Sequence, residues 1–425
     1  MELYRKINLA LLYSSPIFLI FSHSIADIII SFIGINFFIF FITKKIEINF
    51  KEVLSDKVLI YFILFYLVLV FSSYLAEFQS ISFKRSLPYI RFFFFIAALK
   101  YWLLVDNKKI KILIYCIVSS LLFVCVDLIY QYFNYEILIK ESGNVRVGVS
   151  LFGYQSNLGV ERFQGPFRDE FIAGGFVLKF SPFLWLLCFQ YHKLKKTNLS
   201  LFLIFISVVM IFFVIYITGD RSPFFQLLCI SLIATLYLDK KKILILFSSI
   251  FLIVYLFALN SDKKQRYYYD TLDAVGIQKD GFTLDTGYGH LFYVAYKIWV
   301  NNPLLGVGTK NYRKICHRDE YNFESKNNIQ LCSTHPHNYL LELLSETGLI
   351  GLIAFFGLII QIFRNFKIII KKNLYNLELK FTYLSLVFIL WPITTTGSLI
   401  TNKNSMILWF VFALIFSYQK INKTR

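Results

Sequence analysis

The sequence predicts an all-α, polytopic membrane protein with about twelve transmembrane helices and one large polar loop. Hydrophobic residues make up 57% of the 425 positions and charged residues only 16%. Apolar runs of about 18 residues or more recur along the chain, as expected for membrane-spanning helices. Clusters of lysine and arginine separate these runs. A soluble protein of this length would not carry so many long apolar segments.

The apolar runs define the expected spans. Arg5 and Lys6 precede the first run, and no small-residue cleavage site follows it. We therefore expect the first helix to serve as an uncleaved insertion signal. The expected spans lie near residues 8–23, 25–43, 57–76, 86–105, 110–132, 168–190, 199–218, 222–238, 242–259, 338–363, 381–399 and 404–419.

The positions of the basic residues predict the orientation. If the N-terminus is cytoplasmic, every second connection carries a basic cluster, as the positive-inside rule requires. This alternation favours an even number of spans with both termini in the cytoplasm of a bacterial inner membrane. The clusters contain Lys44 and Lys45, Lys108, Lys109 and Lys111, Lys193, Lys195 and Lys196, Lys240, Lys241 and Lys242, Lys367, Lys371 and Lys372, and Lys420, Lys423 and Arg425.

The net charge of +18 does not indicate nucleic-acid binding. The charges lie in small clusters beside apolar runs, with no basic face and no nucleic-acid motif. We expect membrane lipids as neighbours and no nucleic acid as a partner.

A long polar segment divides the chain. Residues 1–259 would hold about nine spans and residues 338–425 about three, with the large periplasmic loop at 260–337 between them. Within the loop, residues 288–302 are aromatic-rich and amphipathic, so we expect a helix along the membrane surface. Asn302 and Pro303 would end this helix.

Cys316 and Cys332 both lie in the large loop. On the oxidising side of the membrane we expect them to form a disulfide, the alternative being two free thiols. The bond would stabilise the fold by about 3 kcal/mol in the chain-entropy model. It would also hold the segment that leads to His335 and His337.

Two of the six histidines, His335 and His337, lie where the polar loop meets an apolar helix. An imidazole there takes a proton near neutral pH. The alternatives are a histidine that hydrogen-bonds the helix terminus and a metal pair. No zinc-type ligand spacing accompanies the pair, so we expect no metal and favour a general base.

Several arginines are expected at the same outer surface. Arg162 and Arg168 come just before the sixth span, and Arg221 lies in a tight turn between the seventh and eighth. Each alone could anchor a helix end or pair with Asp169 or Asp220. Guanidinium groups bind phosphate in bidentate fashion. Together with His337, Arg162 and Arg221 predict a phosphate or diphosphate site.

At these residues the chain resembles the O-antigen ligase family, which shares a C-terminal domain with O-antigen polymerases. The resemblance rests on a His-Asn-x-x-Leu motif, a Glu-x-Gly-x-x-Gly segment and an upstream Pro-x-x-Gly-x-Gly segment. The matching residues are His337-Asn338-Tyr339-Leu340-Leu341, Glu346-Thr347-Gly348-Leu349-Ile350-Gly351 and Pro303-Leu304-Leu305-Gly306-Val307-Gly308. The layout of spans around a large outer loop is also similar.

The resemblance implies a GT-C-like glycosyltransferase of lipopolysaccharide biosynthesis in the cell envelope. Such an enzyme is inverting, needs no metal or cofactor, and works at the periplasmic face. It moves a glycan from a polyprenyl-diphosphate-linked donor to lipid A-core or to a growing glycan.

The resemblance also assigns roles to residues. His337 would be the catalytic base, supported by His335 and Asn338. Arg162, Arg221 and Arg168 would hold the diphosphate. A further family arginine precedes the Pro-x-x-Gly-x-Gly segment. This chain has Tyr288-Gly289-His290 there, so His290 would substitute or the contact would be absent.

Three other readings remain open. A polymerase and a ligase differ only in the acceptor, and the sequence does not separate them. A transporter or flippase would suit the span count and would use polar groups near mid-membrane, for which Asp27, Asp127 and Lys179 are candidates. No two similar halves are visible, which argues against it. A non-catalytic subunit of a polysaccharide-assembly complex is the third alternative.

Overall fold

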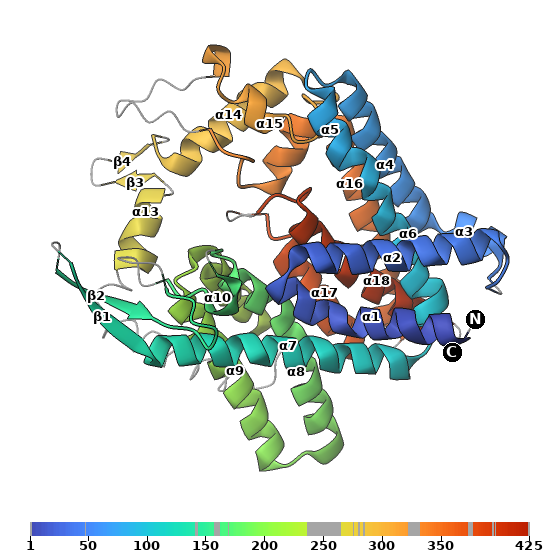
Figure 1. Cartoon of the computed structure of the whole chain (residues 1–425), viewed down its shortest axis with the longest axis horizontal. Helices are drawn as coiled ribbons and strands as arrows, with labels where there is room; N and C mark the ends of the chain where they lie inside the picture. Colours follow the sequence, from blue (N-terminus) through green and yellow to red (C-terminus); the bar gives the residue numbers. More distant parts are fainter. Residues whose placement is uncertain are drawn as a thin grey trace.

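The computed structural model describes most of the chain as a bundle of helices with two small hairpins (Figure 1). The expected ninth span, 242–259, lies outside the described residues. The described residues are 2–46, 48–140, 143–156, 162–168, 170–235, 265–274, 276–278, 281–283, 285–321, 332–372, 377–392, 395 and 397–423.

The N-terminal helices are α1 (Glu2–Phe21), α2 (His23–Ile42), α3 (Phe50–Leu54), α4 (Lys57–Leu75), α5 (Gln79–Ser86), α6 (Arg91–Ala98) and α7 (Asn107–Phe133). The central ones are α8 (Ala173–Lys195), α9 (Asn198–Thr218), α10 (Arg221–Thr235), α13 (Asp270–Ala274), α14 (Gly287–Asn301) and α15 (Tyr312–Ile315). The last three are α16 (Tyr339–Lys372), α17 (Leu377–Ile389) and α18 (Asn402–Lys423).

Shorter elements connect these helices. They include 3₁₀ turns at Leu87–Ile90, Gly165–Phe167 and Asp319–Tyr321, and π turns at Leu99–Leu103 and Gln265–Tyr269. Strands β1 (Tyr135–Lys140) and β2 (Gly143–Gly148) pair antiparallel, with Tyr135 opposite Gly148. Strands β3 (Ile277–Gln278) and β4 (Gly281–Phe282) form a second, minimal hairpin.

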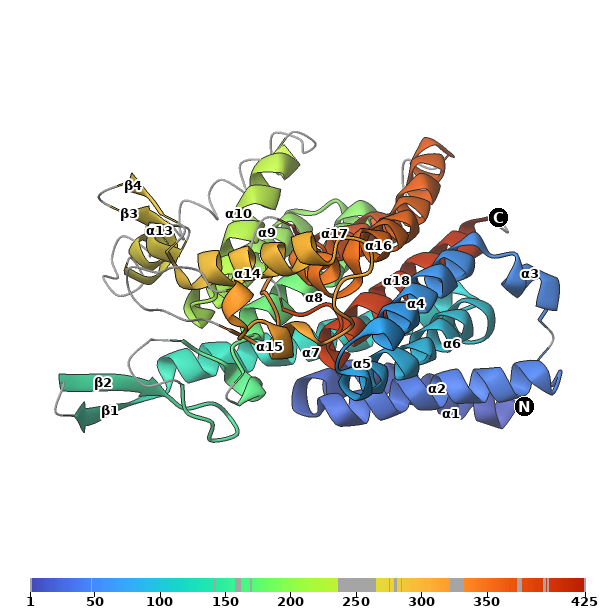
Figure 2. The same ribbon diagram turned by 90° about the horizontal axis from the view of Figure 1, so that it is seen from above.

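The all-α membrane class predicted from the sequence agrees with the structure. Seven of the described helices are long and apolar enough to cross a membrane: α2, α4, α7, α8, α9, α16 and α18. The total of about twelve spans stays a prediction. Both chain ends lie at one end of the molecule, and the β1–β2 hairpin projects from the opposite end (Figures 1 and 2).

Two expected spans differ in detail. The span expected at 86–105 is α6 with tighter or wider turns at its two ends. The span expected at 381–399 is shorter, because α17 ends at Ile389. Pro392 follows closely, and a proline disfavours helical geometry in the residue before it.

The core surrounds α18, which is apolar on all sides, as expected for a helix enclosed by others. Residues from Met406 to Phe416 are almost completely buried against α2, α6, α7 and α17. The few polar groups there are paired: the Trp409 indole N–H donates to the Tyr89 hydroxyl at 3.0 Å. A core of this kind gives a rigid frame for the residues at the helix ends.

Helix α16 is broken at Gly348, which has φ 64° and ψ −167°. The turn segment 303–308 packs into the break. Its Val307 and Gly308 amides donate to the carbonyls of Ser345 and Glu346, both at 2.9 Å. In return, the amides of residues 349 and 350 donate to the carbonyls of residues 303 and 304, at 2.8 and 3.1 Å. The backbone groups freed by the break are therefore satisfied within the protein, as a membrane-spanning segment requires.

Candidate active site

One cavity of about 940 Å³ opens between α8, α10, α14, α17 and α18. Its lining includes Arg162, Arg221, His335 and His337. These four residues come from three distant parts of the sequence. The cavity is the concave, partly polar kind of site that small-molecule ligands occupy.

The turn between α9 and α10 positions the first arginine. Gly219, with φ 69°, ends α9 in the left-handed conformation, and the buried Asp220 follows. The Asp220 carboxylate accepts hydrogen bonds from the Arg162 side chain and from the Gly174 amide, the latter at 3.0 Å. Burial raises the pKa of Asp220, and the charge of Arg162 opposes this effect. The pair orients Arg162 at the cavity wall.

Arg162 keeps a free donor. Its guanidinium lies over the Phe171 ring, 3.7 Å from the centroid. Its Nε atom is buried and has no hydrogen-bond partner among the described residues. A buried donor of this kind costs free energy until an acceptor reaches it.

Two further arginines lie beside Arg162. Arg221 donates to the backbone carbonyl of Asp270. Arg266 donates from Nε to the Gly219 carbonyl at 3.0 Å and lies 3.8 Å from the Asp270 carboxylate. Burial lowers the pKa of Arg266, and the charges of Arg162 and Arg221 lower it further. We call Arg162, Arg221 and Arg266 the arginine cluster.

The sequence reasoning missed Arg266. It precedes the run Tyr267-Tyr268-Tyr269 inside the large polar segment, with no clear helix end to mark it. The Tyr267 hydroxyl reaches the carbonyls of Ile215 and Tyr216 at the end of α9, at 3.1 and 3.0 Å. This anchor brings the π turn, and Arg266 with it, to the cavity. An arginine beside an aromatic run was the available signal.

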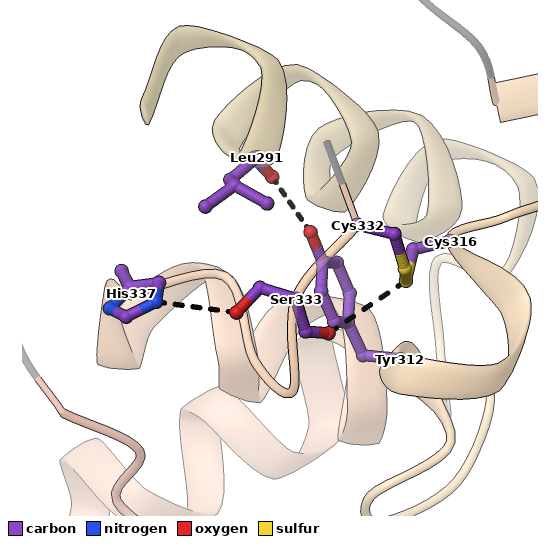
Figure 3. The surroundings of a disulfide bond; sticks show 6 residues. All are labelled: Leu291, Tyr312, Cys316, Cys332, Ser333 and His337. Atoms are coloured by element: carbon purple, nitrogen blue, oxygen red, sulfur yellow. Dashed lines mark hydrogen bonds between the residues drawn. A yellow bond between two sulfur atoms is a disulfide. The ribbon is translucent and has the colours of Figure 1, made fainter. Parts of the chain in front are cut away.

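The two histidines enter the cavity at the start of α16. Their rings lie 4.1 Å apart, and the His337 ring is 5.8 Å from the ring of Tyr288. His337 Nε2 is 3.3 Å from the Ser333 hydroxyl (Figure 3). His337 also has φ 54°, a left-handed conformation that is uncommon for residues other than glycine. Such conformations cluster at functional sites.

The surroundings keep both imidazoles neutral at pH 7. Burial lowers the pKa of His337 below its usual 6.5, and the negative charge of Glu342 partly opposes this. Burial lowers the pKa of His335 to about 4, again opposed by Glu342. A neutral imidazole has a lone pair available for a proton.

Asn338 has a structural role at this point. Its side-chain oxygen accepts from the amides of Leu340 and Leu341, at 3.0 and 3.2 Å, and so caps α16. Its amide nitrogen donates to the Pro392 carbonyl at 3.2 Å. Asn338 thereby fixes the helix start, and with it the neighbouring His337.

Cys316 and Cys332 form a disulfide, with their Cα atoms 5.5 Å apart (Figure 3). Cys332 directly precedes the Ser333–His337 segment, so the bond ties that segment to α15. Among the described residues, one group places three metal-ligating atoms within 4.8 Å, and it consists of these two cysteines and His317. The disulfide occupies both sulfurs, which leaves one ligand.

Two predicted ligands do not line the cavity. Arg168 is exposed, and its Nε donates to the Tyr154 hydroxyl at 3.2 Å. His290 is buried in α14, with Nε2 2.8 Å from the Asp285 carboxylate. The neighbouring Tyr288 and Gly289 do line the cavity. Arg266, which the sequence did not single out, does line the cavity beside Arg162 and Arg221.

Comparison with known families gives a match to part of the chain. A family model described as O-antigen ligase matches residues 206–356. This range includes Arg221, Arg266 and His337, whereas Arg162 precedes it. The resemblance drawn from the sequence motifs is therefore confirmed over this part of the chain. No curated protein sequence matches the chain.

Proposed function

We propose, from the O-antigen ligase match at residues 206–356, that the chain is a glycosyltransferase. It moves a glycan from a polyprenyl-diphosphate carrier to a lipid-linked or glycan acceptor at the periplasmic face. One observation carries the proposal: His337, Arg162 and Arg221 line the same cavity. A base and a cation cluster at one site are what this transfer needs.

The arginine cluster binds the donor's diphosphate. Bond cleavage at the sugar leaves additional negative charge on the diphosphate, and nearby guanidiniums stabilise that charge. The buried Nε of Arg162 offers a hydrogen bond to it. Arginine suits this role because its planar fork matches phosphate oxygens and stays charged.

His337 activates the acceptor. Its neutral imidazole takes the proton from an acceptor hydroxyl as the oxygen attacks the anomeric carbon. Attack from the face opposite the diphosphate inverts that centre. Asn338 and the disulfide hold the segment, and His335 packs against the base. As the family resemblance implies, the reaction as proposed needs neither a metal nor a cofactor.

The proposal includes an orientation. Both termini are cytoplasmic, and the cavity opens to the periplasm of a bacterial inner membrane. The position of both chain ends at the same end of the molecule supports an even number of spans (Figures 1 and 2). The layout of nine spans, large loop and three spans is kept as part of this proposal, as is the GT-C-like fold.

Gene deletion and complementation test the function. A deletion strain should accumulate free carrier-linked polymer if the chain is a ligase, or short capped chains if it is a polymerase. Complementation with His337→Ala should leave the defect, whereas His317→Ala, an exposed histidine of the same loop, should correct it. Full correction by an inserted His337→Ala protein contradicts the proposal.

A further inference from the structure

The cavity contains a second group of cations. Lys179 of α8 and Lys403 at the start of α18 both line it, together with apolar residues such as Phe388, Trp391 and Ile407. We call these two residues the lysine pair. They belong to helices that are distant in sequence, and both border the same cavity.

Lys179 lies well inside a membrane-spanning helix, where charged residues face cavities or partners and mark substrate paths. The other two charged candidates noted in the spans have protein partners. Asp27 accepts from Arg91 at 2.9 Å, and Asp127 accepts from the Leu151 amide at 2.7 Å. The Lys179 ammonium has no hydrogen-bond or carboxylate partner among the described residues, and it faces the cavity.

The lysine pair is separate from the arginine cluster. The arginines influence one another electrostatically, and Lys403 influences Lys179 in the same way. Lys179 also lies five residues beyond Gly174, the residue that contacts Asp220. That spacing is roughly 8 Å along the helix axis. Lys179 therefore lies farther along α8 than the contact between Gly174 and Asp220.

The positive charge of the lysine pair is only partly balanced. The Lys403 ammonium lies 2.9 Å from the Glu170 carboxylate, which is 53% exposed, and 5.2 Å from the Phe167 ring centroid. Among the described lining residues the one carboxylate is Asp220, and it is paired with the Arg162 side chain. In the part of the chain that the structure describes, a carboxylate lies within ion-pair distance of Lys403 but not of Lys179, and two ammonium groups that repel each other in such surroundings favour a bound anion.

We propose that the lysine pair is a second anion subsite, which binds a phosphate of the lipid-anchored acceptor. This inference rests on the proposed function, in which the arginine cluster takes the donor's diphosphate. The acceptor phosphate has two possible sources: the diphosphate of a second carrier lipid or a phosphate of a lipid A-type glycolipid. Apolar residues beside the lysines suit the lipid part of either molecule.

Binding to the purified full chain tests the subsite. The protein is placed in nanodiscs of uncharged phosphatidylcholine and supplied with one equivalent of undecaprenyl diphosphate. Lipid A bisphosphate and further undecaprenyl diphosphate are then titrated separately, and native mass spectrometry counts the bound lipids. Wild type should bind one undecaprenyl diphosphate at the arginine cluster and one additional phosphorylated lipid.

The variants assign each binding event. Lys179→Gln and Lys403→Gln should weaken the additional lipid about tenfold or more, through loss of a charge-assisted contact. They should leave the affinity for the first undecaprenyl diphosphate unchanged. Lys179→Arg should retain the additional lipid, and the control Lys297→Gln, on α14 outside the cavity, should match wild type. Preference for lipid A identifies a glycolipid acceptor, and preference for a second carrier lipid identifies a growing glycan.

Two results would overturn the proposed subsite. In the first, both lysine variants bind the additional lipid as tightly as wild type does. In the second, the lysine variants lose binding of the first and of the additional lipid together. Arg221→Lys reports separately on the proposed function. If Arg221→Lys binds the first undecaprenyl diphosphate as wild type does, the assignment of the donor site is wrong. The lysine variants still report on binding of the second lipid in that case. Thermal unfolding of every variant in the same nanodiscs identifies those that fail to fold. Lys403→Gln lies at a helix end, so it should disturb the fold less than Lys179→Gln, which lies inside α8.

Discussion

The break in α16 predicts that a side chain at Gly348 destabilises the protein. Gly348→Ala places a Cβ atom 2.2 Å from the Leu304 carbonyl carbon and 2.3 Å from its oxygen. Real Cβ atoms do not approach backbone so closely, so the 303–308 segment must move out of the break. The residue also has φ 64°, a conformation that side chains other than glycine strain to adopt.

The magnitude follows from two costs. A residue in this φ,ψ region costs about 1–3 kcal/mol. Overpacking against backbone adds about 1–3 kcal/mol. We therefore expect Gly348→Ala to lower the free energy of unfolding by roughly 2–6 kcal/mol. Gly306→Ala should act similarly, because its Cβ would lie 2.4 Å from the Glu346 carbonyl carbon and its φ is 62°.

The assay is thermal unfolding in detergent, followed by size-exclusion chromatography of the soluble fraction. Gly175→Ala is the matched control. It is a helical glycine, and apart from its own helix backbone no atom lies within 4 Å of the added Cβ, so the stability of this variant should stay equal or rise by about 0.5–1 kcal/mol. A Gly348→Ala protein that unfolds at the wild-type temperature would refute the close pairing of the segment with the broken helix.

Three further predictions concern the loop and the helix beside it. Cys316→Ser with Cys332→Ser should lower stability by about 3 kcal/mol, and added reductant should remove the difference from wild type. The rate of glycan transfer should stay constant from pH 8 to about 7 and fall only below about 6.5, because burial lowers the pKa of His337 and the base acts when neutral. A rate that already falls to half its maximum above pH 7 would contradict this prediction. Lys310→Met should lower stability by about 3–5 kcal/mol in thermal unfolding, because it removes the ammonium that pairs with the buried Glu342 carboxylate at 2.9 Å. The added Glu342→Leu change should restore most of this loss.

Some of the site could be anticipated because helix ends on one face of a membrane meet. Alternation of basic clusters put Arg162, Arg221 and His337 on the same side, and the structure has all three around one cavity. The Asp220 pairing weighed as an alternative is also present, but with Arg162 rather than with the adjacent Arg221. Charge alternation predicts a side of the membrane and does not predict which pairs form.

Other features had no local pattern to predict them. Arg266 reaches the cavity through the contact of Tyr267 with the end of α9, which is remote in sequence. The sequence presents Pro303–Gly308 and Glu346–Gly351 as two separate motifs. In the structure their glycines let the two backbones pack directly against each other, although about forty residues separate them. The sequence identifies Lys179 as a charge inside a span, whereas the cavity that it lines is a feature of the three-dimensional structure.

The most direct test of the account separates binding from transfer. His337→Ala and Arg221→Ala proteins are purified in nanodiscs, and each is measured for undecaprenyl diphosphate affinity and for single-turnover glycan transfer from the host's carrier-linked donor. The account predicts that His337→Ala binds the carrier like wild type but transfers about 10²–10⁴-fold more slowly, whereas Arg221→Ala loses carrier affinity. A His337→Ala protein with wild-type transfer, or an Arg221→Ala protein with wild-type affinity and transfer, would contradict it.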